Sequence, residues 1–301
     1  MKKDITKRFL GKENRYLGKM ISKDVCGFIS RKKINIDTKQ ISYDVIDFRN
    51  VFSTKFTKLN KNNILYLKIK EFVSKNGKRI EFSMIYCEGN KSHSEFLLSE
   101  IEVTQELYEL VMEYNPSWFK GKEDSSQRPV ENVTWYDAVM FCNKLSELQG
   151  KKPYYKIKDI VWHDDGASIQ KANVKINKGA KGFRLPYEQE WEYAAKAGTN
   201  NRWSGTNDES RLGEYAWFLK NSNNATEVVA TKKPNEWGFY DMSGNVFEWC
   251  YDKDDNSLKN SRVIRGGSWC YNALDLRSAL RSDASHIARN YTLGFRVAAS
   301  L

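Results

Sequence analysis

Two neighbouring pieces of sequence decide the fold of this chain: GFYDMSGNVFEWCYD at residues 238–252 and RVIRGGSW at residues 262–269. Gly244 and Asn245 form a turn in the first piece, and Trp249 is a large apolar side chain suited to anchor a core. Other short segments that carry Trp and are interrupted by Gly and Asn lie near these pieces. They predict an irregular fold that is tied together by loops rather than by long elements.

Two longer elements are predicted upstream, and both are helices. Residues 103–116 read VTQELYELVMEYNP, with Thr104 placed as an N-cap and a proline as the stop. Residues 133–150 read VTWYDAVMFCNKLSELQG, where Thr134 and Asp137 have the spacing of an acidic capping box. Apolar side chains at helical spacing follow in each stretch, so both helices are expected to pack one face against the core.

A β-hairpin is predicted closer to the N-terminus. The run ILYLKIKEFV at residues 64–73 alternates apolar and polar side chains, and RIEFSMIY at residues 79–86 is a second run typical of a strand. Asn76 and Gly77 lie between the two runs. An Asn-Gly pair in this position favours a tight hairpin turn.

The composition is typical of a globular protein, since 40% of the 301 residues are apolar and no run approaches the length of about eighteen apolar residues that a membrane span needs. We assign residues 1–78 to an N-terminal extension and residues 79–301 to the main domain. The extension holds 20 Lys and Arg against 7 Asp and Glu, whereas the domain holds 29 against 31. The extension is either an arm attracted to anionic lipid or nucleic acid, or a solvated lysine-rich surface. Its lysines are dispersed and match no nucleic-acid module, so no nucleic-acid partner is expected.

Cysteine usage excludes two further classes of protein. The five cysteines are widely scattered, without a Cys-x-x-Cys pair, at Cys26, Cys87, Cys142, Cys250 and Cys270. An odd number without tight spacing argues against a disulfide framework and against a zinc site. Most of these thiols are therefore expected to be buried and unpaired.

Four islands of sequence occur in a fixed order and end in GGSW and LGFRVA: EVTQELYELVMEYNPS (102–117), PVENVTWYDAVMFCNKLS (129–146), GFRLPYEQEWEYAAKAG (182–198) and the 238–252 piece. Together they resemble the formylglycine-generating-enzyme, or sulfatase-modifying-factor, domain over residues 79–301. The resemblance implies an α+β domain with a C-type-lectin-like fold that is rich in irregular loops. Members usually carry Thr where Tyr187 stands, so a helix cap is expected to be lost there, while Pro186 suits the first turn of that helix.

The resemblance also implies a structural calcium ion at the 238–252 piece. By position, Asp241 and Glu248 would offer carboxylates, and Gly244 and Val246 would offer carbonyl oxygens. Oxygen ligands in a turn suit calcium. The alternative is that Glu248 is hydrogen-bonded to backbone amides without a metal.

Catalysis is not expected. The oxidase chemistry of the family needs two cysteines a few residues apart, shortly after GGS, which hold copper and form a mixed disulfide with the substrate. Cys270 falls one position early and no cysteine follows it, so no copper is expected. The sulfoxide-synthase branch needs a three-histidine iron site, and His93, His163 and His286 are isolated in the sequence. The alternative is an enzyme of either kind with a divergent active site.

The C-terminal pattern of GGSW, RSA-x-R and LGFRV also resembles that of variable proteins diversified by retroelements, and the treponemal members of this class most of all. In those systems a reverse transcriptase randomises adenines, mainly in AAC codons, which then never encode Lys, Glu, Gln, Met or Trp. These five residue types make up about a quarter of this chain, a normal share for a soluble protein, yet none occurs from residue 270 to residue 301. The resemblance therefore implies a variable region at about residues 270–292.

Fifteen positions of that region carry residues that randomised AAC codons can encode and are predicted to bind ligand: Cys270, Tyr271, Asn272, Leu274, Asp275, Leu280, Ser282, Asp283, Ala284, Ser285, His286, Ile287, Asn290, Tyr291 and Thr292. Eleven positions are predicted to be fixed: Ala273, Leu276, Arg277, Ser278, Ala279, Arg281, Arg289, Leu293, Gly294, Phe295 and Arg296. Small residues, Trp269, Phe295 and arginines that bond loop carbonyls are expected to hold the backbone. The alternative for Leu280 and Ile287 is that they belong to the core.

These patterns predict a non-catalytic protein that binds an unknown protein or glycan ligand through a diversified surface. A weaker alternative is an interaction module without diversification. Relatives of the variable proteins are surface lipoproteins, so the resemblance implies the cell surface, with the cytoplasm as the alternative. No lipobox occurs in this sequence, and membrane contact is expected only through a lipid anchor that this chain does not carry.

Overall fold

The computed structural model describes residues 28–34, 41–47, 68–75, 77–253 and 260–301. The chain divides into two compact units, residues 1–71 and residues 72–301. In the first unit, β1 (Phe28–Ile34) and β2 (Ile41–Asp47) pair as an antiparallel ribbon. The remainder of the predicted extension, including Cys26, lies outside the described residues.

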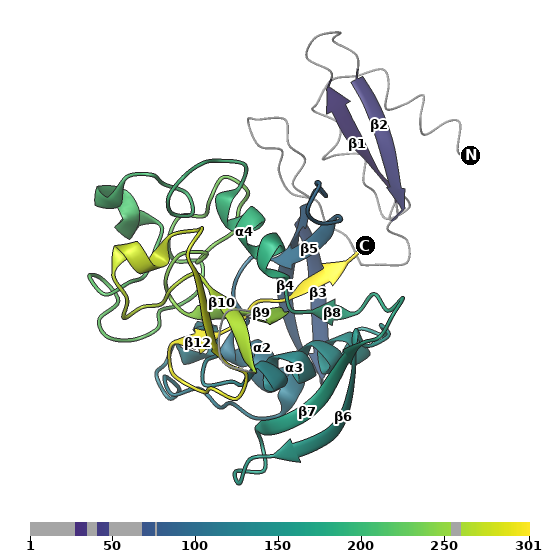
Figure 1. Ribbon diagram of the computed structural model, residues 1–301, viewed down its shortest axis with the longest axis vertical. Helices are drawn as coiled ribbons and strands as arrows, with labels where there is room; N and C mark the ends of the chain where they lie inside the picture. Colours follow the sequence, from purple (N-terminus) through teal and green to yellow (C-terminus); the bar gives the residue numbers. More distant parts are fainter. Residues whose placement is uncertain (1–27, 35–40, 48–67, 76, 254–259) are drawn as a thin grey trace. The chain divides into compact units, whose positions relative to one another are not determined.

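A five-stranded sheet, whose first strand begins at Lys68, joins the two ends of the domain. Its strands are β3 (Lys68–Lys75), β4 (Lys78–Cys87), β5 (Phe96–Ser99), β13 (Ala298–Ser300) and β8 (Phe183–Arg184), in that spatial order. The last strand of the chain lies between β5 and β8 and is antiparallel to both (Figure 1). Residues that precede β13 are therefore fixed by strand pairing at their C-terminal end.

The predicted hairpin at Asn76-Gly77 is confirmed, because β3 and β4 are neighbours in this sheet and Gly77 lies between them with φ +81°. Asn76 itself lies outside the described residues. The boundary predicted between residues 78 and 79 falls at the start of β4, whereas the compact unit begins at residue 72.

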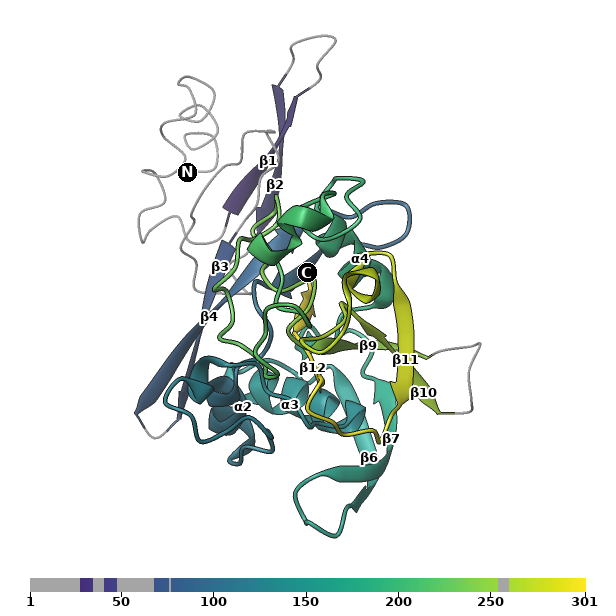
Figure 2. The same ribbon diagram turned by 90° about the vertical axis from the view of Figure 1, so that its left-hand side faces the viewer.

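A second sheet carries the C-terminal segment. Its four strands are β11 (Arg281–Ser285), β10 (Ser261–Arg265), β9 (Phe247–Lys253) and β12 (Leu293–Gly294), in that order. Figure 2 shows β11 at the edge of the sheet beside β10. The 270–292 segment thus contributes an edge strand and otherwise crosses the surface as loops.

The described residues include three α-helices, α2 (Gln105–Met112), α3 (Trp135–Leu148) and α4 (Glu188–Lys196). The two predicted N-caps are confirmed, since Thr104 accepts from the Leu107 N–H and Thr134 forms a capping box with Asp137. The first helix is shorter than predicted, ending at Met112 instead of continuing to Pro116. Glu113 adopts a left-handed conformation, φ 72°, which stops the helix before the proline does.

The start of α4 differs in one detail from the prediction. The Tyr187 side chain makes no capping hydrogen bond, as expected, but its backbone N–H donates to Glu190 Oε2 at 2.9 Å. Pro186 precedes this N-cap residue, so it does not lie in the first helical turn. Half of a capping box is therefore retained without a Thr.

A hairpin of β6 (Tyr155–Trp162) and β7 (Ile169–Ile176) lies beside α3 (Figure 1). Short 3-10 turns occur at η2 (Ser125–Gln127), η3 (Glu209–Glu214) and η4 (Ala273–Leu276). No helix in the described ranges has the length and apolar character needed to cross a bilayer. The domain is therefore α+β, with few helices and many irregular connections.

Aromatic side chains connect the helices to the C-terminal segment in the core. The Phe141 ring stacks on Tyr108 at 5.5 Å and meets Phe295 edge-on at 5.2 Å between ring centroids. Trp249, the predicted anchor, is fully buried, and its indole donates to the Val133 carbonyl at 3.1 Å. Three of the five cysteines are confirmed as buried and unpaired thiols: Cys87, Cys142 and Cys250.

Candidate functional site

The 270–292 segment separates cleanly into accessible and buried positions. None of the fifteen predicted ligand-binding residues is buried. Eight are exposed: Tyr271, Asn272, Leu274, Asp283, Ser285, Ile287, Asn290 and Tyr291. Seven are half-buried: Cys270, Asp275, Leu280, Ser282, Ala284, His286 and Thr292. The core alternative for Leu280 and Ile287 therefore fails.

Most of the predicted fixed positions behave differently. Seven of them are buried: Ala273, Leu276, Ser278, Leu293, Gly294, Phe295 and Arg296. Of the other four, three are arginines whose side chains form hydrogen bonds or ion pairs. Arg277 Nε donates to the Leu274 carbonyl at 2.7 Å, Arg281 pairs with Glu188 at 3.0 Å and Arg289 pairs with Asp165 at 2.5 Å. Nothing in the structure explains why Ala279, which is exposed, should be fixed.

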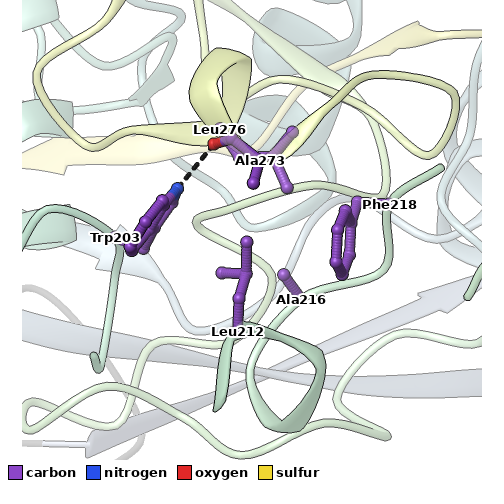
Figure 3. Packing of buried hydrophobic residues seen from close by; sticks show 6 residues of the cluster. All are labelled: Trp203, Leu212, Ala216, Phe218, Ala273 and Leu276. Atoms are coloured by element: carbon purple, nitrogen blue, oxygen red, sulfur yellow. Dashed lines mark hydrogen bonds between the residues drawn. The ribbon is translucent and has the colours of Figure 1, made fainter. Parts of the chain in front are cut away.

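An apolar cluster holds the first part of the segment (Figure 3). Ala273 and Leu276 of η4 pack among four buried residues of the 203–218 region: Trp203, Leu212, Ala216 and Phe218. The Trp203 indole also donates to the Ala273 carbonyl at 2.6 Å. Two apolar side chains and one carbonyl therefore fix η4, while Leu274 between them is 57% exposed.

Gly267, directly before Ser268, allows η4 to approach the turn closely. Gly267 has φ +76°, and a Cβ there would lie 2.9 Å from both the Asp275 carbonyl oxygen and Leu276 Cδ1. Any side chain at this position would force η4 away and strain the backbone as well. The GGSW motif therefore fixes the path of the residues that follow it.

A buried arginine holds the middle of the segment. Arg265, at the end of β10, is completely buried, and its guanidinium donates to the carbonyls of Ser278, at 3.1 Å, and Leu280. The same guanidinium pairs with Glu192 at 2.5 Å. Charge-assisted hydrogen bonds of this kind are stronger than neutral ones. They fix the backbone at Leu280 without engaging its side chain.

The last part of the segment is also held through its backbone carbonyls. The backbone N–H groups of Trp135, Asn132 and Phe247 donate to the carbonyls of His286, Asn290 and Thr292 at 3.0, 3.0 and 2.8 Å. The Trp269 indole donates to the Tyr291 carbonyl at 3.0 Å. Among the described residues, the only side-chain hydrogen bonds made by the fifteen positions join Cys270 to Ser268 and Asn290 to Thr292. The scaffold therefore binds the backbone and leaves most of the side chains free.

Trp118 and Phe119 extend the accessible surface of residues 270–292. No pattern in the sequence indicated that they lie there. Trp118 is 70% exposed, and its ring centroid lies 6.4 Å from that of Tyr291. Phe119 contacts both Trp269 and Tyr291, at 5.6 and 6.3 Å. These residues follow Pro116, where the sequence indicated only the end of a helix. Their proximity depends on contacts 150 or more positions apart, for which no local pattern exists.

Glu131 holds Trp118 and Phe119, which we call the Trp118 loop, in place. Its two carboxylate oxygens accept from the backbone N–H groups of Trp118 and Phe119, each at 2.9 Å. The side chain is fully buried, and desolvation raises the pKa of the Glu131 carboxyl to about 7, although these two hydrogen bonds and Lys120 oppose the shift.

The predicted calcium ligands are engaged with other partners. Glu248 accepts from Arg296 Nε at 2.6 Å and Nη2 at 2.7 Å, and from the Trp191 indole at 2.7 Å, so its partners are side chains and not the backbone amides of the alternative. The Asp241 carboxylate accepts from the Ala230 N–H through one oxygen, while its other oxygen is buried without a partner, and burial raises its pKa to about 6.

These donors do not fit a calcium site as they are placed, because a guanidinium already neutralises Glu248 and would repel a cation. Gly244 and Val246, the predicted carbonyl ligands, lie in the same buried turn, where the Val246 N–H donates to Glu102 at 3.2 Å. Within the described ranges, no group of three His, Cys, Asp or Glu residues could hold a metal. Calcium stays a prediction, and the geometry favours a structural ion pair.

Cys270 is the only half-buried thiol in the described part of the chain, and its Sγ lies 3.6 Å from Ser268 Oγ. Desolvation raises the thiol pKa of the three buried cysteines, Cys87, Cys142 and Cys250. His286 contacts the Tyr136 ring at 4.9 Å, and burial and Arg262 lower its pKa. The described residues therefore offer one accessible thiol and no pair.

Comparison with known proteins agrees with this geometry. The model of the sulfatase-modifying factor enzyme 1-like domain matches residues 68–301. The chain belongs to this family. Among solved structures, Treponema denticola variable protein 1 is 35% identical, with a TM-score of 0.66 over 76% of this chain and 98% of that one. The family fold, α+β and C-type-lectin-like, is thereby confirmed.

The curated proteins that are similar to this chain carry names of different kinds. The chaperone protein LppX of Paenibacillus barcinonensis is 39% identical over 61% of this chain and 72% of its own length. The inactive Cα-formylglycine-generating enzyme 2 of Bos taurus is 30% identical over 50% of this chain and 41% of its own. Formylglycine-generating enzymes also match. Relatives thus include inactive proteins and a variable protein as well as enzymes.

Proposed function

We propose that this chain is a non-catalytic ligand-binding protein, and that residues 270–292 form a sequence-variable surface diversified by a retroelement. One observation carries the proposal. All fifteen predicted positions are accessible, while the scaffold holds the segment mainly through backbone carbonyls and buried neighbours. Such a segment can change its side chains with little effect on the fold. The similarity to Treponema denticola variable protein 1 supports the same function.

The chemistry of the surface suits a macromolecular ligand. Tyr271, Leu274, Ile287 and Tyr291 are between 39% and 57% exposed, and Trp118 next to Tyr291 is 70% exposed. Aromatic side chains dominate binding hot spots and lose little conformational entropy on binding. Fifteen positions together with the Trp118 loop are sufficient for much of the about 800 Å² that each partner buries in a standard interface. The partner in this proposal is a protein or a glycan.

The rival function is an enzyme of the formylglycine-generating or sulfoxide-synthase type with a divergent active site. Ser268 Oγ lies 3.6 Å from Cys270 Sγ, which is the observation that favours it. Against it, thiol oxidase chemistry needs a second cysteine, and the other three thiols in the described ranges are buried. By analogy with variable proteins, we propose that the chain is a lipoprotein at the cell surface, with the cytoplasm as the alternative.

A display library tests the proposal directly. The fifteen codons are randomised as AAC-derived mixtures, and a matched library randomises the seven buried fixed positions in the same way. We expect the first library to stay folded and to yield different sequences against different purified proteins and glycans, while the second loses display. Equal loss of display in both libraries would contradict the proposal. Thiol-dependent turnover that disappears in Cys270→Ser would favour the enzyme instead.

A further inference from the structure

Residues 151–181, which comprise the β6–β7 hairpin and the short segments on either side of it, concentrate positive charge in the main domain. Residues 151–181 hold eight Lys and three Asp, whereas the rest of residues 79–301 holds 21 Lys and Arg against 28 Asp and Glu. An acidic domain thus carries one basic segment. Four of its lysines lie in the two strands of the hairpin, and the other four flank them, while the three Asp lie within the hairpin. The near-zero net charge of residues 79–301 as a whole conceals this contrast.

Strand pairing gathers four of these lysines on one face of the hairpin. Lys156 lies opposite Lys175, Lys158 lies opposite Asn173, and Val161 lies opposite Lys171. Residues paired across antiparallel strands share a face, so the four lysines form one row, which we call the lysine face. All four are exposed, and within the described ranges none forms an ion pair. Like charges placed directly opposite one another, as Lys156 and Lys175 are, destabilise a hairpin unless an anion lies over them.

Two exposed apolar side chains lie at the end of the hairpin nearest its turn, where the strand register shifts. Val161, opposite Lys171, and Trp162 beside it are each 46% exposed. The hairpin itself is firmly attached. The Asn143 side chain of α3 exchanges two hydrogen bonds with the Tyr155 backbone, at 2.8 and 3.0 Å, and the Ile169 N–H donates to Asp137 at 2.8 Å. Figures 1 and 2 both place the hairpin at the edge of the domain beside α3. Its inner side chains, such as Val174, are half-buried, and the lysine face points away from them.

We propose that the lysine face docks onto the surface of an anionic phospholipid membrane, with Val161 and Trp162 entering the interfacial layer. Lysines near such a surface are attracted to its phosphate groups, and Trp prefers the boundary between headgroups and hydrocarbon. A nucleic acid or another polyanion would use the lysines and could stack on Trp162, but it would gain nothing from the aliphatic Val161. Positive charge that ends in an exposed apolar pair therefore matches a membrane better. This docking does not depend on the ligand-binding function of residues 270–292.

Vesicle binding by the full chain tests the proposal. The vesicles consist of phosphatidylcholine alone or of phosphatidylcholine mixed with phosphatidylglycerol, and binding is measured by flotation at low and physiological salt. One variant replaces the lysine face by Lys156→Gln, Lys158→Gln, Lys171→Gln and Lys175→Gln. The matched control makes the same charge change in the N-terminal extension, by Lys2→Gln, Lys3→Gln, Lys7→Gln and Lys12→Gln. Circular dichroism checks that both variants are folded.

We expect the parent chain and the control to bind only the mixed vesicles, more weakly as salt rises, and the lysine-face variant to bind on the order of a hundredfold less tightly. Brominated lipid should quench part of the tryptophan fluorescence, and Trp162→Phe should remove that quenching. Absence of binding to the mixed vesicles, or equal loss in both variants, would overturn the proposal. Hairpin-dependent binding of single-stranded DNA without vesicle binding would overturn it in favour of a nucleic acid.

Discussion

Residues 238–252 and residues 270–292 belong to one domain but are held in place by opposite means. In the first region, every residue from Asp241 to Cys250 is buried, and side chains such as Asn245 and Glu248 make the hydrogen bonds. In the second region, the rest of the domain mostly hydrogen-bonds to backbone carbonyls, and the side chains between these hydrogen bonds are accessible. A fold can therefore fix the backbone path of a segment while its side chains are free to vary. The predictions below test that contrast.

The largest effect is expected from breaking the buried ion pair of the first region. Glu248→Ala leaves the Arg296 guanidinium buried without a carboxylate, which costs about 3–5 kcal/mol of the free energy of unfolding. The matched control is Asp283→Ala in the second region, where the carboxylate is exposed and the expected change is within about 0.5 kcal/mol. Urea unfolding of both variants measures the difference. Similar losses of unfolding free energy in the two variants would contradict the contrast between the two regions.

Two leucines that lie two positions apart make the sharpest test inside the second region. Leu276 is fully buried beside Trp203, so Leu276→Ala should lower the free energy of unfolding by about 2–5 kcal/mol. Leu274 is 57% exposed, and Leu274→Ala should change it by less than about 0.5 kcal/mol. Thermal unfolding followed by circular dichroism separates them. A large loss in Leu274→Ala would mean that this side chain belongs to the core.

A pH-dependent effect is expected from Glu131, beneath the Trp118 loop. Its pKa in the folded chain is raised from an ordinary 4.5 to about 7, so the folded state binds a proton more tightly than the unfolded state. The corresponding stability is present below pH 4.5 and is lost as the pH rises through 7, up to about 3 kcal/mol. Glu131→Gln should remove this slope, as urea unfolding across that pH range would reveal. An unchanged slope in the variant would assign it to another group.

The smallest expected effect is that of removing calcium. Because Glu248 is committed to Arg296 and Trp191, addition of EDTA should leave the melting temperature unchanged. Differential scanning calorimetry with and without added calcium measures this. A melting temperature that rises with calcium and falls with EDTA would show that the turn rearranges to bind the ion. Asp241, with one unpartnered oxygen, would then be the first ligand to examine.

Much of this fold was visible in the sequence because its signals are local. Caps at Thr104 and Thr134 and the turn at Gly77 depend on residues a few positions apart, and all three are found in the structure. The end of the first helix was misplaced because Glu113 adopts a left-handed conformation that only its surroundings can impose.

The site was predicted in part, for a related reason. A restricted set of residue types marked the 270–292 segment, because that signal also lies in one stretch of sequence. Three contacts join distant segments of the chain: Trp118 with Tyr291, Arg265 with the Ser278 carbonyl, and Glu248 with Arg296. No spacing within a single stretch can encode such contacts, so they required the three-dimensional structure.

The central claim is that residues 270–292 are a diversified surface on a fixed frame. Sequencing the 3′ end of the gene and its downstream DNA from many isolates tests it most directly. We predict that differences crowd into the fifteen accessible codons, at adenines, and spare Ala273, Leu276 and Phe295. A near-copy template and a reverse-transcriptase gene should lie nearby. An invariant segment without such a template would contradict the claim and would make Cys270 and Ser268 the place to look for chemistry.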